Sequence, residues 1–521
     1  LYWVAISMSK TIIIIGAGLA GLSAALQAAE NGCNVKLVSS LPSERAQSVM
    51  AEGGINAALN TKDENDSPEE HFTDTIKAAC GLADPNAVWG MTQAAPELVH
   101  WLLKLGVKFN MSGYDDVDLR NFGGQKKKRT AFAQSDTGKQ IMTAMIDAVR
   151  RKEASGMVER FSHHSFLTLR LCGNICCGCV IRDEYSQETV ELPGDAVIVA
   201  TGGMHGLFGN TTGSLSNTGE VTAELFRLGV PLANGEMIQY HPTTVKCGGK
   251  RMLISEAARG EGGRLFAMKD GKQWYFMEEK YPELGNLMPR DITAREIWKV
   301  SHESEVFLDM TEISEEIISN KLSGLADDCM TYLHKDIRKE PVSVLPGIHY
   351  FMGGILVDEQ HRTPIQNLYA AGECCAQYHG ANRLGGNSLL GALYGGRVAA
   401  KSACEQADVV DLSCATQIDF PPASQISEIK QLNKVMQETM GVVRNENTLL
   451  NGIKTVQALT GNLPLLGMAV LKSALARKES RGAHWREDYP KSNDDDYLKT
   501  TVARFDGKQI QISFVPVPER R

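Results

Sequence analysis

The feature that most constrains the fold is a glycine-rich turn close to the start of the chain. Thr11–Ile15 is β-branched at every position, which predicts a strand buried on both faces of a parallel sheet. The turn Gly-Ala-Gly-Leu-Ala-Gly follows, and then come an Ala-rich helical run, Leu22–Glu30, and a second short strand, Val35–Val38. This arrangement predicts a βαβ unit of about thirty residues with the glycines at its first crossover. Such a unit binds the phosphates of a dinucleotide at the N-terminus of its helix.

The three glycines of this turn have different expected roles. Gly16 allows the tight turn, Gly18 lets the backbone approach a pyrophosphate, and Gly21 lets the helix pack closely on the strand. An acidic residue usually follows the second strand and binds the ribose, but Ser39 and Ser40 stand there. Their hydroxyl groups make similar but weaker contacts. The turn alone does not separate FAD from NAD.

Two later segments repeat the pattern of a strand that ends in glycines. Ala196–Ala200 leads into Thr201 and Gly202, and Leu368–Glu373 has the same form. Because these strand ends lie far apart in the sequence, we predict one nucleotide-binding domain that is interrupted by a long insertion.

The last part of the chain is predicted to be helical and then charged. Beyond about Pro421, the segments Ile426–Glu438 and Thr455–Lys478 carry apolar residues at helical spacing. A charged tail, Arg481–Arg521, follows, and Asp494–Asp496 within it is expected to be a solvated turn.

Together these patterns predict an α/β fold. A Rossmann-like nucleotide-binding domain is interrupted by a mixed α+β capping domain and followed by a C-terminal helical domain. The predicted boundaries are 8–235 and 347–420 for the nucleotide-binding domain, 236–346 for the capping domain, 421–490 for the helical domain and 491–521 for a C-terminal tail.

The composition argues against several other functions. The chain has 54 Lys and Arg against 62 Asp and Glu, a net charge of −8, which disfavours nucleic acid as the main partner because phosphate binding needs a basic surface. No window approaches about 18 uninterrupted apolar residues, so we expect no membrane span. Leu1–Ser7 is apolar but too short for a signal sequence, and Met8 is a candidate start, with the first seven residues a leader or an expression remnant.

The 12 cysteines are scattered, and only Cys172, Cys176, Cys177 and Cys179 form a cluster. A structural metal site needs converging ligands at defined spacings, and no second CxxC or His pair accompanies this cluster. Neighbouring strand residues also point to opposite faces, so Cys176 and Cys177 would diverge. We therefore predict no metal site and reduced thiols in a cytoplasmic fold.

Five segments are too polar and too rich in glycine for ordinary core. They are Ile238–Thr244, Ile254–Gly263, Met288–Thr293, His349–Gly354 and His379–Leu389. Each has a structural explanation on its own, because a His beside Pro is often a loop residue and Arg290-Asp291 could be a local ion pair. Together they supply imidazole, guanidinium and hydroxyl donors, which a site for a small dianion needs around its two carboxylates.

At this point the chain resembles the flavoprotein subunit of fumarate reductase and succinate dehydrogenase. The resemblance runs from about Lys10 to the C-terminus. It rests on specific motifs: Ala51–Ile55, Phe122–Gly124, His241–Thr243, Arg259–Gly263, Pro289–Asp291, Ala381–Gly385 and Ala476–His484. It implies that the nucleotide-binding domain is an FAD-binding domain and that a dicarboxylate is the substrate.

The resemblance also implies roles for individual residues. The residues implied to bind substrate are Phe122, His241, Ser255, His349 and Arg383. Arg290 would exchange a proton at a substrate carbon, with Glu256 and Arg259 as its proton relay and His241 as a further catalytic group. The implied reaction is hydride transfer from reduced flavin N5 to one alkene carbon of fumarate, while Arg290 protonates the other. Because a free guanidinium scarcely deprotonates, this role needs clustered cations and the exclusion of water.

The turn and the resemblance together imply a set of flavin contacts. These are Gly16, Ala17, Gly18, Ala20, Gly21, Ser39, Ser40, Ser48, Gly53, Gly54, Thr201, Gly202, Glu220, Glu373, Arg383, Ser388 and Leu389. Glu220 stands where the family usually has Asp. Gln47 stands where respiratory members carry the His that tethers FAD, and an amide cannot form that bond. We therefore expect dissociable FAD and a bias toward fumarate reduction, because covalent attachment raises the flavin potential in this family.

Two alternative functions remain open from the sequence. The first resembles L-aspartate oxidase, which shares several motifs and lacks the tether; Gly385–Asn387 and the segment Glu479–Pro490 speak against it. The second is a non-catalytic flavin electron carrier, which would have lost part of the dicarboxylate site.

The resemblance extends to partners and location. It implies an iron–sulfur subunit held by a membrane anchor, so that a cytoplasmic chain would be membrane-associated on the cytoplasmic face through its partners. Gln47 argues against such partners, because soluble relatives with non-covalent flavin use other electron donors.

Overall fold

The computed structural model describes residues 9–114, 116–408, 420 and 425–521. Leu1–Ser7 and Met8 lie outside the described residues, and so does the expected start of the helical domain at 421.

The described residues include a parallel five-stranded sheet in the order β20-β10-β1-β2-β6. Its strands are β1 (Thr11–Ile15), β2 (Asn34–Ser39), β6 (Val158–Ser162), β10 (Ala196–Val199) and β20 (Leu368–Ala370). In this sheet Ile13 of β1 lies opposite Lys36 and Val197. The strand predicted over Thr11–Ile15 is therefore confirmed, and β2, β10 and β20 lie within a residue or two of their predicted positions.

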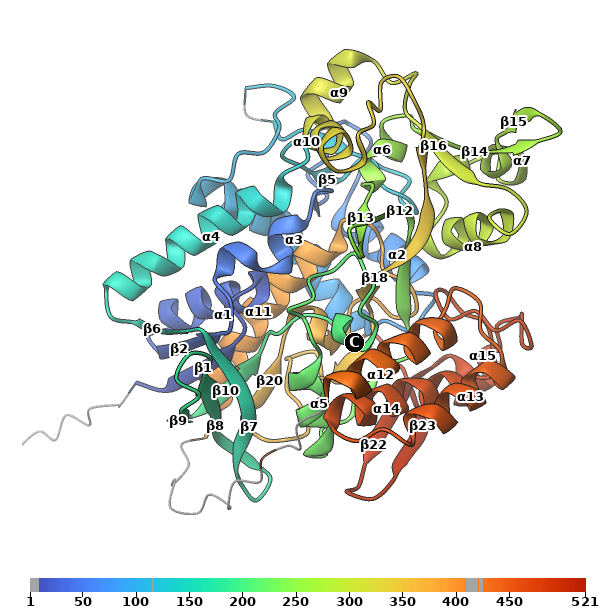
Figure 1. The fold of residues 1–521 in the computed structure, drawn as a ribbon. Helices are drawn as coiled ribbons and strands as arrows, with labels where there is room; N and C mark the ends of the chain where they lie inside the picture. Colours follow the sequence, from blue (N-terminus) through green and yellow to red (C-terminus); the bar gives the residue numbers. More distant parts are fainter. Residues whose placement is uncertain (1–8, 115, 409–419, 421–424) are drawn as a thin grey trace, which may run out of the picture.

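Alternate residues of β1 pack against different layers. Ile12 and Ile14 belong to the core shared with helices, whereas Ile13 and Ile15 belong to the core shared with an antiparallel sheet. Figure 1 shows these two layers on opposite sides of the parallel sheet. The helices are α1 (Leu19–Glu30), α3 (Pro85–Leu105), α4 (Thr137–Ala154) and α11 (Asn387–Gln406), and the strands are β7 (His164–Cys172), β8 (Ile175–Asp183) and β9 (Thr189–Pro193). Burial on both faces explains the continuous apolar run.

A mixed α and β region occupies the upper part of Figure 1. One antiparallel sheet consists of β12 (Ile238–Cys247), β13 (Lys250–Leu253) and β18 (Leu345–Phe351), and a second of β14 (Arg264–Lys269), β15 (Lys272–Trp274), β16 (Val306–Asp309) and β17 (Val342–Ser343). The helices here are α6 (Glu256–Gly260), α7 (Phe276–Lys280), α8 (Arg290–Val300), α9 (Glu315–Lys321) and α10 (Ser323–Asp328), with the π-helix η5 (Cys329–Leu333). This region corresponds to the predicted capping insertion.

Shorter elements connect these parts. They are η1 (Ser43–Arg45), η2 (Gln47–Met50), β3 (Ile55–Asn56), α2 (Pro68–Ala78), β4 (Leu119–Arg120), β5 (Thr130–Ala131), η3 (His205–Leu207), α5 (Glu220–Arg227), β11 (Leu232–Ala233), η4 (Gly285–Leu287), β19 (Gly354–Leu356), η6 (Gly372–Cys374) and β21 (Cys375–Ala376).

The helical end differs from the prediction in one respect. α12 (Ile426–Thr439) matches the predicted helix closely, but the single helix predicted over Thr455–Lys478 is wrong. The chain instead forms α13 (Glu446–Val456) and α14 (Asn462–Ala476). Gly461 precedes α14 with a φ of +107°, a left-handed conformation that other residues rarely adopt, and this ends the helical run.

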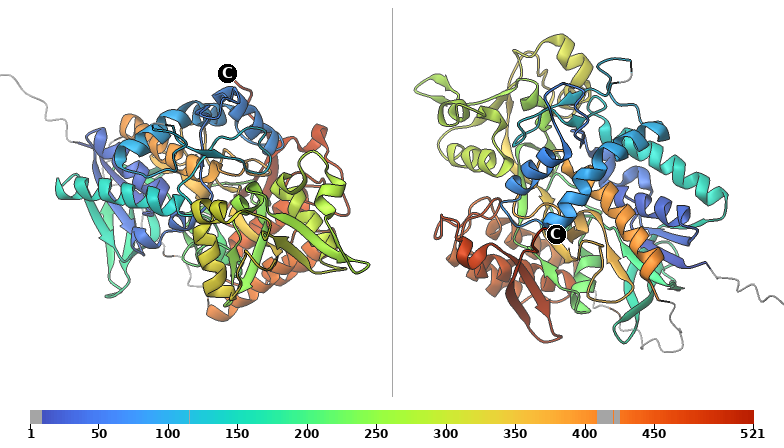
Figure 2. Two further views of the ribbon diagram at one scale, coloured as in Figure 1. Left: turned by 90° about the horizontal axis from the view of Figure 1, so that it is seen from above. Right: turned by 180° about the vertical axis from the view of Figure 1, so that it is seen from behind.

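The predicted C-terminal tail is also different, because most of it is folded into a sheet. After α15 (Asp494–Tyr497), where a solvated turn was expected, β22 (Lys499–Phe505) and β23 (Ile510–Pro516) form a hairpin. β22 pairs with β11, and Thr501 and Arg477 both bond the buried carboxylate of Glu236. Figure 2 shows this hairpin in red beside the helical end. The tail is thus fastened to the segment that leads into the capping region.

The cysteine cluster lies on β7 and β8. Cys176, Cys177 and Cys179 are buried free thiols, but Cys172, expected to be reduced, is disulfide-bonded. Among the described residues, no group of His, Cys, Asp and Glu is arranged to hold a metal ion. In the same part of the chain, every helix is too short or too polar to span a membrane.

Candidate active site

One cavity of about 980 Å³ extends from the glycine-rich turn after β1 to the β12–β13 hairpin. Of the residues predicted to bind cofactor or substrate or to take part in catalysis, only Gly21 and Arg259 are absent from its wall. The predicted residues that line it are Gly16, Ala17, Gly18, Ala20, Ser39, Ser40, Ser48, Gly53, Gly54, Phe122, Thr201, Gly202, Glu220, His241, Ser255, Glu256, Arg290, His349, Glu373, Arg383, Ser388 and Leu389. Segments from both ends of the sequence therefore meet in one space.

The nucleotide end of the cavity is built on close packing of α1 against the sheet. A Cβ at Gly16 would lie 2.3 Å from the carbonyl oxygen of Ala200, and a Cβ at Gly21 would lie 1.8 Å from the carbonyl oxygen of Gly16. Neither position has room for a side chain. Gly21 therefore acts through helix packing and not on the cavity wall.

Gly18 has a different environment and gives a test of whether a dinucleotide fits. A Cβ there would make only ordinary contacts, 3.7 Å from Ser48 Oγ and 3.8 Å from the Cβ of Ala46, and its φ of −79° suits any residue. The fold itself does not require glycine here, whereas a phosphate close to the backbone would. Within the described ranges the N-cap residue of α1 makes no side-chain cap bond, although the N–H of Leu19 donates to Ser48 Oγ at 3.2 Å. This cradle fits the pyrophosphate of FAD.

The N-terminus of α11 also faces the cavity. Among residues 9–114, 116–408, 420 and 425–521 it has no side-chain cap, and Ser388 and Leu389 of its first turn line the wall. The amide of Asn56 fixes the preceding loop by donating to the carbonyl oxygen of Gly385 at 2.7 Å and to Oδ1 of Asn387 at 2.8 Å. A second set of N–H groups is thereby held toward the space that a dinucleotide would occupy.

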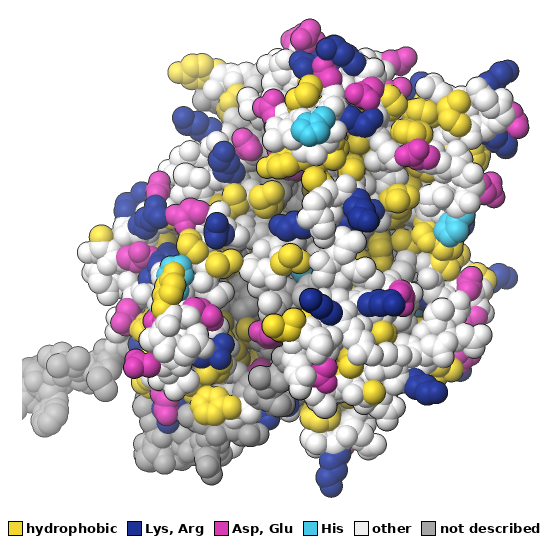
Figure 3. All heavy atoms as spheres, viewed as in Figure 1, with side chains coloured by type: hydrophobic (Ala, Val, Ile, Leu, Met, Phe, Trp, Pro, Cys, Tyr) yellow, Lys and Arg dark blue, Asp and Glu magenta, His cyan; other side chains and the backbone are white. Residues whose placement is uncertain are grey.

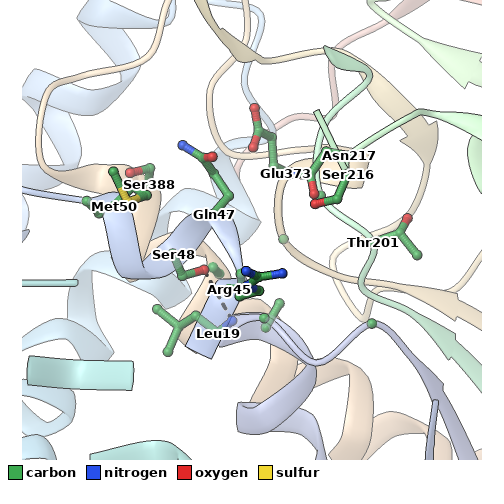
Figure 4. A pocket seen from close by; sticks show the side chains of 18 of the residues that line it. Leu19, Arg45, Gln47, Ser48, Met50, Thr201, Ser216, Asn217, Glu373 and Ser388 are labelled. Atoms are coloured by element: carbon green, nitrogen blue, oxygen red, sulfur yellow. Dashed lines mark hydrogen bonds between the residues drawn. The ribbon is translucent and has the colours of Figure 1, made fainter. Parts of the chain in front are cut away.

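Figure 4 shows part of this cavity, with 18 of the residues that line it. Gln47 of η2 and Glu373 of η6 extend in about the same direction in this view, and Ser48, Met50 and Ser388 are drawn on the side of Gln47 away from Glu373 or below it. Glu373 is held in place because its Oε1 accepts the N–H of Phe351 at 3.0 Å. The residue at the tether position therefore lines the cavity with an amide.

Arg290, the first residue of α8, is held firmly at the opposite end. Its Nε and Nη2 donate to Glu256 Oε2 at 2.8 and 2.5 Å, and its Nη1 donates to Gln239 Oε1 at 3.2 Å. A guanidinium has five N–H groups, so the three bonds found among the described residues leave two for a ligand. The side chain is only 6% exposed.

Glu256 connects Arg290 to Arg259. Its Oε1 accepts the N–H of Gly123 at 2.9 Å and lies 3.4 Å from Arg259 Nη2. Burial alone would raise the pKa of Glu256, but the charges of Arg290 and Arg259 outweigh burial and lower it. Arg259 Nη1 donates to the carbonyl oxygen of Asn286 at 2.6 Å. The three side chains form a continuous buried chain that leads away from the cavity.

His241 and Arg383 are buried beside Arg290, and the half-buried His349 completes this cluster. The two imidazole centroids are 5.1 Å apart. Burial, followed by the charge of Arg290, holds the pKa of both histidines well below 6.5. The same two causes lower the pKa of Arg383 to about 9. The charges of Arg290 and Arg383 therefore lie close enough to act on one another, and a dianionic ligand between them would stabilise both. On the face in Figure 3, several Lys and Arg side chains gather near the middle of the molecule.

Sequence reasoning missed several residues that hold these groups. Gln239 accepts from Arg290 and donates to the carbonyl oxygen of Arg383 at 2.8 Å, Thr212 Oγ1 bonds His349 Nδ1 at 2.7 Å, and the ring of Tyr350 lies under Arg383. Gln239 and Tyr350 fall within polar segments that the sequence singles out. Thr212 does not, and no local pattern marks it.

Comparison with known proteins identifies the family. Residues 11–389 match a model described as "FAD binding domain", and residues 459–520 match "Fumarate reductase flavoprotein C-term". The chain is 38% identical to the succinate dehydrogenase flavoprotein subunit of Bacillus subtilis (strain 168), covering 98% of each. It is 32% identical to the 8-methylmenaquinol:fumarate reductase flavoprotein subunit of Wolinella succinogenes, covering 98% of this chain and 92% of the relative.

Solved structures agree with this assignment. The E. coli quinol fumarate reductase FrdA superposes with a TM-score of 0.89 at 27% identity, covering 98% of this chain and 97% of the other. Adenylylsulfate reductase of Archaeoglobus fulgidus, at 17% identity and a TM-score of 0.77, shares the fold alone. The chain is thus an FAD-dependent oxidoreductase that belongs to the family of succinate dehydrogenase and fumarate reductase flavoprotein subunits.

Proposed function

We propose that this chain is the catalytic flavoprotein subunit of an enzyme that interconverts fumarate and succinate, and that it works mainly as a fumarate reductase. The observation that carries the proposal is the placement of Arg290. Arg290 lines the cavity that also contains His241, His349 and Arg383, and two of its N–H groups have no partner in the part of the chain that the structure describes. A four-carbon diacid offers two carboxylates to these donors.

In this proposal one end of the cavity binds FAD and the other end binds the dicarboxylate. FAD bound against the turn after β1 would supply the hydride in fumarate reduction. Arg383 and the neutral imidazoles of His241 and His349 bind one carboxylate and stabilise the negative charge that develops on it. Phe122 is buried, and it closes the wall next to Gly53. A bound substrate would displace water from these groups, which would strengthen their electrostatic effect.

The proton takes a separate route. Arg290 holds the proton that the second substrate carbon receives, and Glu256 and Arg259 replace it. The route needs a guanidinium that gives up a proton more readily than usual, and burial lowers the pKa of Arg259. Glu256 remains a charged acceptor between the two because its own pKa is lowered.

We also propose that FAD is dissociable and that this favours fumarate reduction. The support is Gln47, whose amide lines the cavity at the position implied for the histidyl tether. Acid precipitation of the native protein should leave the flavin in the supernatant. Fluorescent flavin in the pellet would show that the tether is formed elsewhere.

The proposed partners are an iron–sulfur subunit and a membrane anchor that holds it at the cytoplasmic face. The support is the match of residues 459–520 and the names of the relatives, which describe them as subunits. Co-purification of a cysteine-rich subunit with this chain is the expected result, and purification of the chain alone from its natural membranes would contradict the proposal.

The decisive experiment is anaerobic. The FAD-loaded protein is reduced with dithionite, and fumarate is then added while the flavin absorbance is followed. Fumarate should restore the oxidised spectrum, Arg290→Lys should prevent this because Lys lacks the planar donor fork, and Arg295→Lys on the same helix should not. Formation of peroxide with L-aspartate, without a response to fumarate, would support an L-aspartate oxidase instead. A flavin that responds to neither would support the electron carrier.

A further inference from the structure

Glu52 is an acidic residue in the cavity to which the resemblance assigns no role. It lies in the turn between η2 and β3, where its carbonyl oxygen accepts the hydroxyl of Thr137 at 3.2 Å. Its side chain lines the cavity and hydrogen-bonds that of Ser255. The second carboxyl oxygen, Oε2, is buried and has no hydrogen-bond partner among the described residues. An ionised carboxylate in this position would carry a buried oxygen without compensation.

The surroundings of Glu52 favour its uncharged form. Burial has the largest effect, followed by Asp328, and together with Asp136 these outweigh the contributions of Ser255 and Arg120 and raise the pKa of Glu52 to about 8. The titratable and charged groups that face it from other elements are Arg120 (β4), Asp136 (before α4), Asp328 (α10) and Cys329 (η5). Of these only Arg120 is positive. At neutral pH Glu52 therefore carries a proton.

The same cavity thus contains two acids in opposite states. Glu256, paired with Arg290 and Arg259, is ionised, whereas Glu52 is protonated, although Ser255, its hydrogen-bond partner, is next to Glu256 in the chain. Environments that shift the pKa values of two carboxyl groups in opposite directions give the two groups different functions. Glu256 accepts hydrogen bonds from arginine, and Glu52 has an O–H to donate.

We propose that Glu52 binds the dicarboxylate as an uncharged carboxylic acid and donates a hydrogen bond from Oε2 to one of the ligand's carboxylates. This inference rests on the proposed function, because it needs a dicarboxylate in the cavity. The proton stays on Glu52 and no covalent bond changes. Loss of that proton would replace a donor by a negative charge, and a negative charge in a water-poor cavity repels a dianion.

The proposal predicts how binding depends on pH. Because only the protonated form binds well, affinity is retained below the pKa of Glu52 and falls by about tenfold per pH unit above it. Arg383 has a pKa of about 9, so its deprotonation causes a second loss of dicarboxylate affinity at higher pH. His241 and His349 stay neutral throughout this range and add nothing to it.

The test uses the FAD-loaded protein and malonate, a dicarboxylate whose single methylene group leaves no CH–CH bond to oxidise. Isothermal titration calorimetry from pH 6.5 to 9.5 gives the Kd. The parent should lose affinity from about pH 8, as the pKa of Glu52 requires. Glu52→Gln keeps an uncharged donor of nearly the same shape, so it should bind malonate with a constant Kd until the loss near pH 9 that Arg383 causes.

A second variant tests the same group without altering it. Asp328 raises the pKa of Glu52. Asp328→Asn should therefore move the pH at which malonate affinity begins to fall to a lower value. Asp327→Asn is the matched control, because this neighbour on α10 is exposed and should leave the onset unchanged.

The outcomes separate this inference from the proposed function. A parent profile that is flat to pH 9, or a Glu52→Gln profile with the same onset as the parent, overturns the role of Glu52 while leaving the dicarboxylate site intact. Failure of the parent to bind malonate at any pH overturns the proposed function itself. If Glu52→Gln does not fold, the shift expected for Asp328→Asn still decides the question.

Discussion

At the scale of single residues, the chemistry depends on how Arg290 is held. Its contacts with Glu256 and Gln239 join segments that are far apart in the sequence. The motif containing Arg290 is visible in the sequence, but its partners are not, because side-chain hydrogen bonds leave no periodic signal. Family resemblance supplied the role of Glu256, and the structure adds the position of Gln239.

The relay gives a prediction at this scale. Glu256→Gln keeps the hydrogen bonds to Arg290 but cannot carry a proton, so kcat should fall by about a hundredfold or more while the KM for fumarate is not raised. Steady-state assays with a reduced dye measure both constants. Glu261→Gln is the control, because Glu261 pairs with Lys321 at 3.1 Å and is off the cavity wall. Turnover within twofold of the parent in Glu256→Gln would rule out the relay.

At the scale of elements, the strand–turn–helix after Thr11 was predictable because its glycines and its apolar run are local signals. The break at Gly461 was missed because apolar residues continue at helical spacing on both sides of it. The hairpin near the C-terminus was also missed. Ile510–Pro516 does alternate apolar and polar residues at first, but the charged residues around it suggested a tail. The other strand of the hairpin, β22, pairs with β11, which lies far away in the sequence.

The turn after β1 gives the prediction at this scale. Gly18→Ala should fold normally, because the added Cβ meets nothing closer than 3.7 Å, but it should lose FAD affinity because the methyl group occupies the space of a phosphate. Gly21→Ala should instead destabilise the whole fold, since its Cβ would lie 1.8 Å from a backbone oxygen. Thermal unfolding and flavin content separate the two effects. Full flavin content in Gly18→Ala would contradict the proposed pyrophosphate position.

At the scale of the whole molecule, buried histidines control stability in acid. Burial lowers the pKa of six of them: His71, His241, His349, His361, His379 and His484. The unfolded chain binds protons at these residues below pH 6.5, whereas the folded chain does not until much lower pH. Stability is therefore retained above pH 6.5 and lost as pH falls below it, by about 1.4 kcal/mol per pH unit for each histidine.

The measurement is a series of thermal unfolding curves between pH 7.5 and 5.5, in which Tm should decrease steadily below pH 6.5. His100→Gln, at an exposed position, should leave this slope unchanged. A Tm that stays constant or rises on acidification would show that the histidines are charged in the folded state. Sequence alone could not supply this prediction, since it does not reveal which histidines become buried.

One wall of the cavity is formed by residues that are synthesised late, and this has a consequence for biosynthesis. Glu373, Arg383 and Ser388 come from the last third of the chain, and β22, which fastens the segment before the capping region, is made later still. While the ribosome is still translating the middle of the message, the nascent polypeptide has its glycine turn but lacks the opposite wall. Flavin loading is therefore expected to follow release from the ribosome, and until then the half-built sheet presents the apolar surface that molecular chaperones recognise.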